Sequence, residues 1–132
     1  MLIGVGMDLA QVDFWAKALG DPATAVIEAT FTPAERTYAQ AAKGPTAEHL
    51  AARFAAKEAF VKAVGATRHG QPPLINRLDL RCVEVERDQH GRPRIALHGE
   101  ARTLAGQLGV RHVWLSLTHT EGTAGAVVVL EG

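Results

Sequence analysis

The stretch that most constrains this chain runs from Leu50 to Gly65 and reads LAARFAAKEAFVKAVG. At roughly 100° per residue, a helix here gathers bulky apolar side chains on one arc and alanines on most of the opposite side. A helix that is apolar or small nearly all round is usually buried. Four charged residues nevertheless interrupt it, and Lys57 falls inside the bulky arc; the four are Arg53, Lys57, Glu58 and Lys62.

Two interpretations of these charges are open. In the first, Glu58 and Lys62 form an ordinary (i, i+4) helix pair worth a few tenths of a kcal/mol, and the side chains of Arg53 and Lys57 extend to water. In the second, the four residues belong to a site. Buried charge is expensive unless it is paired, bound to a metal or in contact with a charged ligand.

Composition narrows the class of protein. The 132 residues are 47% hydrophobic and 21% charged, which predicts one folded domain over residues 1–132 and argues against disorder. The formal net charge is zero, so no global field favours nucleic acid or an anionic membrane. The single cysteine, Cys82, excludes an intrachain disulfide and a multi-cysteine metal site. No basic signal-peptide start and no apolar run of about 20 residues is found, so a cytoplasmic location is the expectation.

The first residues, Met1 to Leu9, predict a buried strand. Gly4 and Gly6 are poor strand residues unless another backbone or a ligand approaches closely. The aspartate near the end of this strand, Asp8, has two interpretations that stay open. It caps the following helix, or it binds a metal or substrate.

The first half of the chain is otherwise helical. Short helices are expected over residues 11–19 and 25–29, and Thr32, Pro33 and Glu35 form a capping-box start for a third. Capping alone explains Glu35. Thr46 is expected to cap a long helix of about residues 46–64, which Gly65 ends.

Strands dominate the second half. Alternation predicts a strand over residues 78–85, a hairpin turn over 88–93 and a return strand over 94–98. A helix over 99–108 and two further strands, 110–117 and 124–130, follow. The fold class is therefore α+β, with an antiparallel sheet packed against the long central helix.

Asp8 and Glu58 are hard oxygen ligands without a histidine beside them. This favours Mg²⁺, which is typically held by one or two carboxylates with waters and substrate phosphates. Lys62 and Arg53 make a phosphoryl-transfer site physically coherent. A lone histidine such as His119 is more often structural than catalytic.

Four blocks in the chain resemble one known family. They are IGVGMDL at Ile3–Leu9, FTPAE at Phe31–Glu35, RFAAKEAFVKAVG at Arg53–Gly65 and, more weakly, SLTH at Ser116–His119. In this order they resemble the holo-acyl-carrier-protein synthases, the small single-domain class of 4′-phosphopantetheinyl transferases of lipid and fatty acid biosynthesis. The pattern (F/W)xxKExxxK together with GxGxD carries most of the resemblance.

The resemblance implies a reaction and a set of roles. Coenzyme A donates its phosphopantetheine arm to a serine of an apo carrier protein, and adenosine 3′,5′-bisphosphate is released. By similarity, Asp8 and Glu58 bind Mg²⁺, and Lys62 offsets charge on the phosphates. Glu58 or a metal-bound water takes the serine proton. The remaining residues implied to contact coenzyme A are Arg53, Lys57, Gly65 and His119.

The resemblance also implies a homotrimer with active sites between subunits, and an acidic, helical acyl carrier protein of the fatty-acid or polyketide type as partner. In the family that partner binds through basic residues of the first helix. Here Phe14 stands where an arginine is common, and Lys17 is the helix's one basic residue. Transfer chemistry is little affected by this departure, but we expect carrier recognition to differ.

Two other function classes fit the same residues. One is a coenzyme A or nucleotide-binding protein without catalysis, which retained Mg²⁺-dependent turnover would exclude. The other is a different Mg²⁺-dependent phosphoryl-transfer or hydrolytic enzyme, which would consume coenzyme A without a carrier protein.

Overall fold

A computed structural model describes all residues from 1 to 132. The elements follow one another in this order: β1 (Leu2–Gln11), α1 (Val12–Leu19), α2 (Val26–Thr30), α3 (Pro33–Ala41), α4 (Thr46–Ala66), the 3₁₀ turn η1 (Leu80–Cys82), β2 (Val83–Arg87), β3 (Pro93–Leu97), α5 (Gly99–Gln107), β4 (His112–Thr120) and β5 (Thr123–Glu131).

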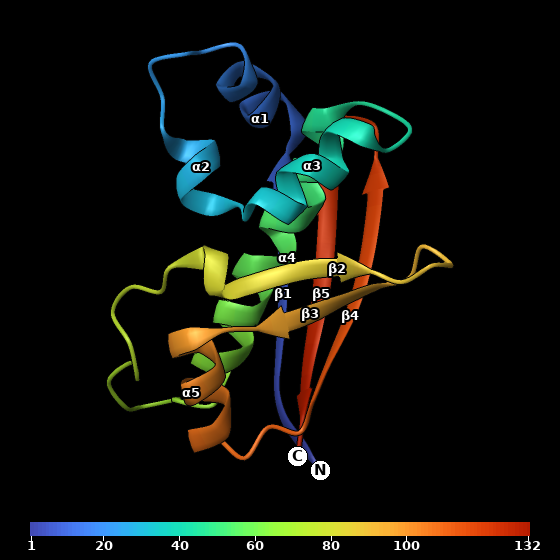
Figure 1. The fold of residues 1–132 in the computed structure, drawn as a ribbon. Helices are drawn as coiled ribbons and strands as arrows, with labels where there is room; N and C mark the ends of the chain where they lie inside the picture. The colour runs from blue at the N-terminus through green and yellow to red at the C-terminus, as the bar shows by residue number, and fades with distance from the viewer.

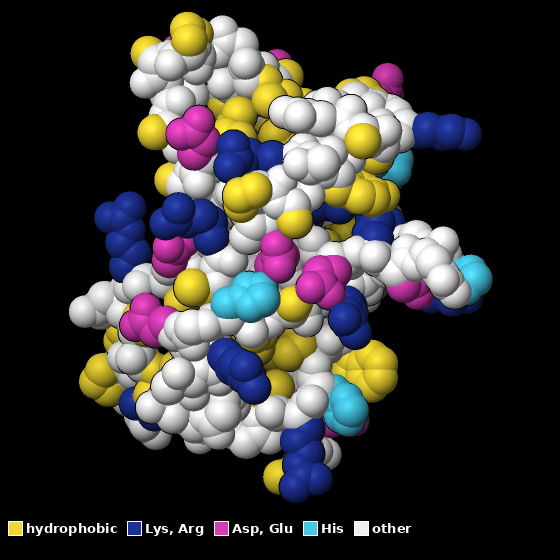
Figure 2. All heavy atoms as spheres, viewed as in Figure 1, with side chains coloured by type: hydrophobic (Ala, Val, Ile, Leu, Met, Phe, Trp, Pro, Cys, Tyr) yellow, Lys and Arg dark blue, Asp and Glu magenta, His cyan; other side chains and the backbone are white.

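Strands β1, β5 and β4 form an antiparallel sheet with β5 in the centre. The 21-residue helix α4 packs along one face of this sheet, chiefly against β1 and β5 (Figure 1). The α+β fold with an antiparallel sheet on a long central helix is thereby confirmed. Strands β2 and β3 form a separate two-stranded hairpin, which crosses α4 on the side away from the sheet. The surface over this hairpin mixes acidic, basic and histidine side chains (Figure 2).

The two glycines of β1 allow the strand to touch α4. A Cβ atom on Gly6 would overlap the carbonyl oxygen of Ala59, and one on Gly4 would overlap that of Ala63. Ala59 and Ala63 are themselves fully buried. The close approach expected from these glycines is therefore made by a helix backbone, and the alanine-rich side of α4 is the side that faces the sheet.

The structure confirms one of the two predicted helix N-caps. Thr32 and Glu35 form the predicted capping box of α3. Thr46 does not cap α4: it is the first helical residue, and Pro45 takes the capping position without a side-chain hydrogen bond. The helix also continues through Gly65 to Ala66, because Gly65 keeps helical geometry and hydrogen bonding there.

The strand expected over residues 78–85 is shorter than predicted. Residues 80–82 form η1 instead, and the carboxylate of Asp79 caps this turn by accepting from the backbone N–H of Arg81. The strand begins only at Val83.

None of the helices combines the length and apolar character that crossing a membrane requires. The two chain ends meet, since the amino group of Met1 donates to the carbonyl of Gly132 over 3.0 Å.

Candidate active site

Asp8 lies on the face of β1 that packs against α4, together with Gly4, Gly6 and Ala10. The strand runs on to Gln11, and the cap of α1 makes no side-chain hydrogen bond, so Asp8 is not a helix cap. Its Oδ1 accepts a hydrogen bond from Nζ of Lys62 over 2.8 Å. The interpretation of Asp8 as part of a polar site is the one that this geometry supports.

Glu58 lies one helical turn before Lys62 on α4 and is half-buried. Burial raises the pKa of Glu58, and the negative charge of Asp8 raises it further, while Lys62 opposes both effects. The hydrogen bond to Asp8 in turn raises the pKa of Lys62. A strand and a helix thus bring two carboxylates and one ammonium group together, although 50 residues separate Asp8 from Glu58 in the chain.

Two mutually repelling carboxylates are a fitting place for a divalent cation. No cluster of three or more histidine, cysteine, aspartate or glutamate side chains is present. Sites of that kind suit zinc, whereas Mg²⁺ needs only one or two carboxylates when waters and phosphate oxygens complete its shell. The ammonium of Lys62 already shows that a cation is accommodated beside Asp8.

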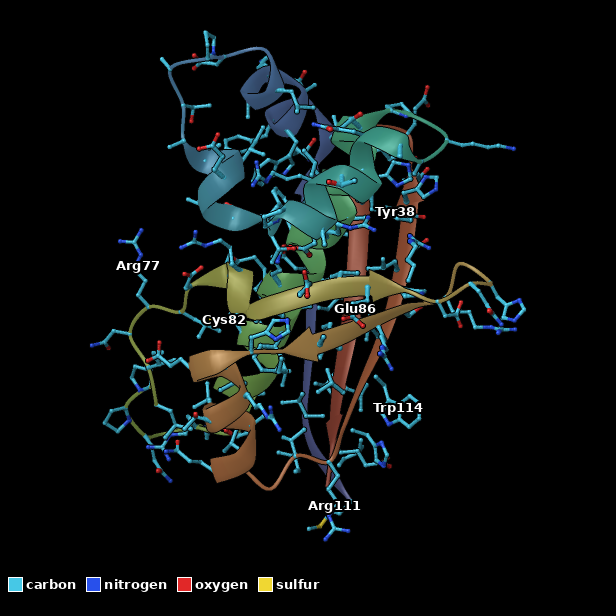
Figure 3. All side chains as sticks on the ribbon, in the orientation of Figure 1. Tyr38, Arg77, Cys82, Glu86, Arg111 and Trp114 are labelled. Atoms are coloured by element: carbon cyan, nitrogen blue, oxygen red, sulfur yellow. The ribbon has the colours of Figure 1, made fainter.

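Glu58 opens onto a groove of about 670 Å³ between α2 and the segment that leads into η1. Its walls come from α2, from α4 and from residues 77–81, with Glu100 at one edge. Arg77 lines the groove and extends outward from the connection between α4 and η1 (Figure 3). The groove leaves the carboxylate of Glu58 accessible from the surface, and Asp8 and Lys62 are not part of its lining.

Lys57 points the opposite way, into the protein interior. Its side chain is fully buried, and Nζ donates to Glu35 over 2.8 Å and to the carbonyls of Leu80 and Val83 over 2.8 and 2.6 Å. Burial lowers the pKa of Lys57 and the charge of Glu35 opposes this. All three N–H donors are used, so the prediction that Lys57 binds coenzyme A does not fit this arrangement.

Glu35 has more to do than cap α3. One of its oxygens accepts from the backbone N–H of Thr32 and from Lys57, and the other accepts from the N–H of Val85 over 2.9 Å. Sequence reasoning missed this second role. The signal was the lysine inside the bulky arc of α4, which required a buried acid somewhere in the chain.

Arg53 is also buried, with 1% of its surface exposed, so the extension to water considered for it and for Lys57 is wrong. Its guanidinium lies 4.4 Å from the ring centre of Tyr38, and Nη1 donates to the carbonyl of His49. Its Nε has no partner. Burial, and then the neighbouring charge of Arg87, lower the pKa of Arg53. The predicted contact of Arg53 with coenzyme A phosphates stays a prediction.

His119 lies near the end of β4, apart from the carboxylate pair. Its Nδ1 is 3.6 Å from Glu48, and it lines a recess of about 390 Å³ together with Arg87, His49 and polar residues of β4. This recess shares no lining residue with the groove of Glu58. Gly65 lines a third, apolar cavity of about 120 Å³ beneath residues 73–78. Within one chain, His119 therefore lies on a different surface from Glu58, whereas the cavity of Gly65 adjoins the groove of Glu58 through the shared lining residues Val61 and Leu78.

Comparisons with known proteins give the family of this chain. A family model described as the 4′-phosphopantetheinyl transferase superfamily matches residues 4–128. A holo-acyl-carrier-protein synthase of Mycobacterium ulcerans is 43% identical over 130 residues, which cover 98% of this chain and 97% of that protein.

Solved structures give the same result. The acyl carrier protein synthase of Mycobacterium tuberculosis superposes with a TM-score of 0.76 at 40% identity, covering 99% of this chain and 98% of the other. The Chronobacterium ammoniagenes synthase in complex with coenzyme A superposes with a TM-score of 0.82 at 36% identity, covering 96% and 95%. With the family model spanning nearly the whole chain and relatives above 40% identity at full length, this chain belongs to the 4′-phosphopantetheinyl transferase superfamily.

Proposed function

We propose that this protein transfers 4′-phosphopantetheine from coenzyme A to a serine of an apo acyl carrier protein, of the fatty-acid or polyketide type, in a Mg²⁺-dependent reaction. Residues 1–132 form one phosphopantetheinyl transferase domain. The observation that carries the proposal is the convergence of Asp8, Glu58 and Lys62, with Glu58 opening onto a groove, in a chain of this family.

The reaction is a phosphoryl transfer. The serine Oγ attacks the phosphorus that bears the pantetheine arm, and a phosphodiester bond forms there. The bond from that phosphorus to the bridging oxygen breaks, and adenosine 3′,5′-bisphosphate leaves with the bridging oxygen. The serine loses its proton, and charge grows on the leaving phosphate.

The side chains of the site match these demands. Glu58 opens onto the groove, so its carboxylate is placed to accept the serine proton. Lys62 carries a positive charge beside Asp8 and offsets the charge that develops on the phosphate oxygens. Asp8 orients this ammonium group. Asp8 and Glu58 would hold Mg²⁺, which supplies charge neutralisation at the pyrophosphate when bound.

We further propose a homotrimer whose active sites lie between subunits. The face of the sheet away from α4 exposes contiguous apolar side chains: Val5 and Val129 are paired neighbours on β1 and β5, as are Met7 and Val127. Trp114 projects outward from β4 next to them (Figure 3). An exposed patch of this kind supports burial against other copies of the chain.

A homotrimer would also explain why the predicted site residues lie on different surfaces of one chain. The recess of His119 and Arg87 and the groove of Glu58 lie on different surfaces of one chain. A second copy can place its recess opposite the groove of the first. Both surfaces would then contribute to one coenzyme A site.

The test is an intact-mass assay of an apo acyl carrier protein incubated with this protein, coenzyme A and Mg²⁺. The expected result is a phosphopantetheine adduct that EDTA abolishes and that a serine-to-alanine carrier does not form. Consumption of coenzyme A without any adduct would favour a hydrolytic enzyme. Binding of coenzyme A without turnover on several carriers would favour a binding protein.

A further inference from the structure

The apolar cavity lined by Gly65 lies directly beyond the groove that contains Glu58. We call it the α4–α5 cavity. Its walls are the C-terminal half of α4, the connection from α4 to η1, and Leu104 of α5, which lie side by side in Figure 1. Its volume is about 120 Å³. Since an apolar cavity of about 150 Å³ can hold a benzene ring, this one has room for about four or five carbon atoms.

The lining of the α4–α5 cavity suits an uncharged, apolar group. Most of the side chains are aliphatic or aromatic, and Phe60, Val64 and Leu104 among them are buried. No lysine, histidine or carboxylate lines the cavity. Its polar residues are Arg68 and Asn76, and Nε of Arg68 donates to a backbone carbonyl of the loop over 3.0 Å. A charged group would lose hydration among these side chains, whereas an apolar group gains free energy by leaving water.

The cavity and the groove follow one line along α4. Val61 and Leu78 line both of them, so the two spaces adjoin. Glu58, Val61 and Gly65 are three and then four residues apart, which places them on one face of the helix. At 1.5 Å per residue, Gly65 lies about 10 Å beyond Glu58 along the helix axis. A ligand whose reacting group lies at Glu58 can therefore extend into the cavity without leaving this face of α4.

The substrate of the proposed reaction carries a long arm on its reacting phosphorus. Between phosphorus and sulfur, pantetheine has as many chain bonds as a peptide of about four residues, which spans roughly 14 Å when extended. With the phosphorus near Glu58, the sulfur therefore reaches the α4–α5 cavity. The arm itself contains amide and hydroxyl groups and is polar. A carbon chain attached to the sulfur is apolar and matches the lining of the cavity.

We propose that the α4–α5 cavity receives the acyl chain of an acyl-coenzyme A and that its volume limits this chain to about five carbons. The protein would then transfer acylated phosphopantetheine as well as the free form. The step is the same phosphoryl transfer: the bond from phosphorus to the bridging oxygen breaks, the bond to the serine Oγ forms, and the thioester stays intact. This inference rests on the proposed transfer to a carrier serine.

The first test needs no variant. Isothermal titration calorimetry measures the Kd of free, acetyl-, butyryl- and octanoyl-coenzyme A with Mg²⁺ present, and kcat/KM is measured for their transfer to an apo acyl carrier protein. Butyryl-coenzyme A should bind about tenfold more tightly than acetyl-coenzyme A, because each buried methylene strengthens binding about fourfold. Octanoyl-coenzyme A exceeds the cavity and should lose this gain. A Kd and a kcat/KM that do not vary with chain length would overturn the proposal.

The second test enlarges the cavity. Leu104→Ala removes most of the wall that α5 contributes, so it should raise kcat/KM for octanoyl- relative to butyryl-coenzyme A about tenfold, while free coenzyme A stays within about twofold. Leu108→Ala is the matched control, since Leu108 packs against the core just past the end of α5 and does not line the cavity. It should keep the original preference. The same preference in folded Leu104→Ala would contradict the proposal.

Adenosine 3′,5′-bisphosphate distinguishes an acyl site from a nucleotide site. If Leu104→Ala weakens the binding of this nucleotide and acyl chains have no effect, the cavity holds the adenine ring, and the acyl proposal fails while transfer stands. If butyryl-coenzyme A binds most tightly but no adduct forms on any carrier, the proposed function fails. The protein would then bind acyl-coenzyme A without transferring it, with the α4–α5 cavity as the acyl site.

Discussion

Replacing Lys57 by methionine should destabilise the fold severely, because it breaks a fully buried ion pair. The methionine fills a similar volume but leaves the carboxylate of Glu35 without its cation at 0% side-chain exposure. It also leaves the carbonyls of Leu80 and Val83 without their donor. Removing one partner of a buried pair typically costs about 3–5 kcal/mol of unfolding free energy. For a chain of this size that lowers Tm by about 10–20 °C.

Denaturation in urea at a fixed protomer concentration, followed by circular dichroism, measures this loss. Lys62→Met is the matched control, since it is a lysine of the same helix whose side chain is exposed. It should shift the urea midpoint far less than Lys57→Met does, while transfer activity falls. The double variant Glu35→Gln with Lys57→Met should regain about 2 kcal/mol over Lys57→Met alone, because no unpaired buried charge remains.

One result would refute this reasoning. If Lys57→Met unfolds at the same urea concentration as the original chain and instead raises the KM for coenzyme A, Lys57 serves the ligand. The role of Lys57 would then be ligand binding, and not the buried ion pair with Glu35. The Lys62→Met control separates this outcome from a general effect of removing positive charge from α4.

Three further predictions concern the site, the strand–helix contact and the sheet face. Because burial and Asp8 raise the pKa of Glu58, the metal-free protein should lose stability as pH rises from the ordinary glutamate value through the raised one. Glu58→Gln should remove this dependence in a Tm series with EDTA and lower transfer at least about 100-fold; a persisting pH dependence would assign it to another group. Gly6→Ala should lower the free energy of unfolding in urea by about 3 kcal/mol or more, because the new methyl group overlaps the carbonyl of Ala59. An unchanged free energy would mean that the helix can move away. Met7→Glu should reduce the proposed trimer to monomers in light scattering, and an unchanged mass would place the interface elsewhere.

The parts of the fold that follow local rules could be predicted from the sequence. The capping box of α3 involves residues three apart, and the helical span of α4 follows from its apolar and small residues. The beginning of β2 could not be predicted in the same way. Alternation continues back to Leu78, but the Asp79 cap turns residues 80–82 into η1. A side chain that competes for backbone N–H groups overrides the apolar pattern there.

The sequence names the candidate residues, but only the packing divides them between the protein interior and the surface. Spacing placed Lys57 among the bulky side chains, yet its acid partner lies 22 residues earlier and already has a sufficient local explanation as a cap. The sequence around Lys57 does not show whether its ammonium pairs with acceptors inside the protein or binds a phosphate. The packing of α3 and the hairpin against α4 supplies the internal acceptors.

Lys57 and Glu58, which are adjacent on α4, therefore have different roles. Successive helical residues point about 100° apart, so Lys57 enters the interior while Glu58 opens onto the groove. On the interior side, Lys57 ties α4 to α3 and to the hairpin through Glu35 and Val83.

The rotation of α4 about its own axis is thus fixed from two directions. The hydrogen bonds of Lys57 hold one side of the helix, and the contact of Ala59 with Gly6 holds another. Asp8 lies two residues beyond Gly6 on the same face of β1. A turn of α4 in either direction would break one of these contacts before it could separate Glu58 from Asp8. The buried contacts of Lys57, and of Ala59 with Gly6, in this way determine the spacing of the two carboxylates on which the proposed chemistry depends.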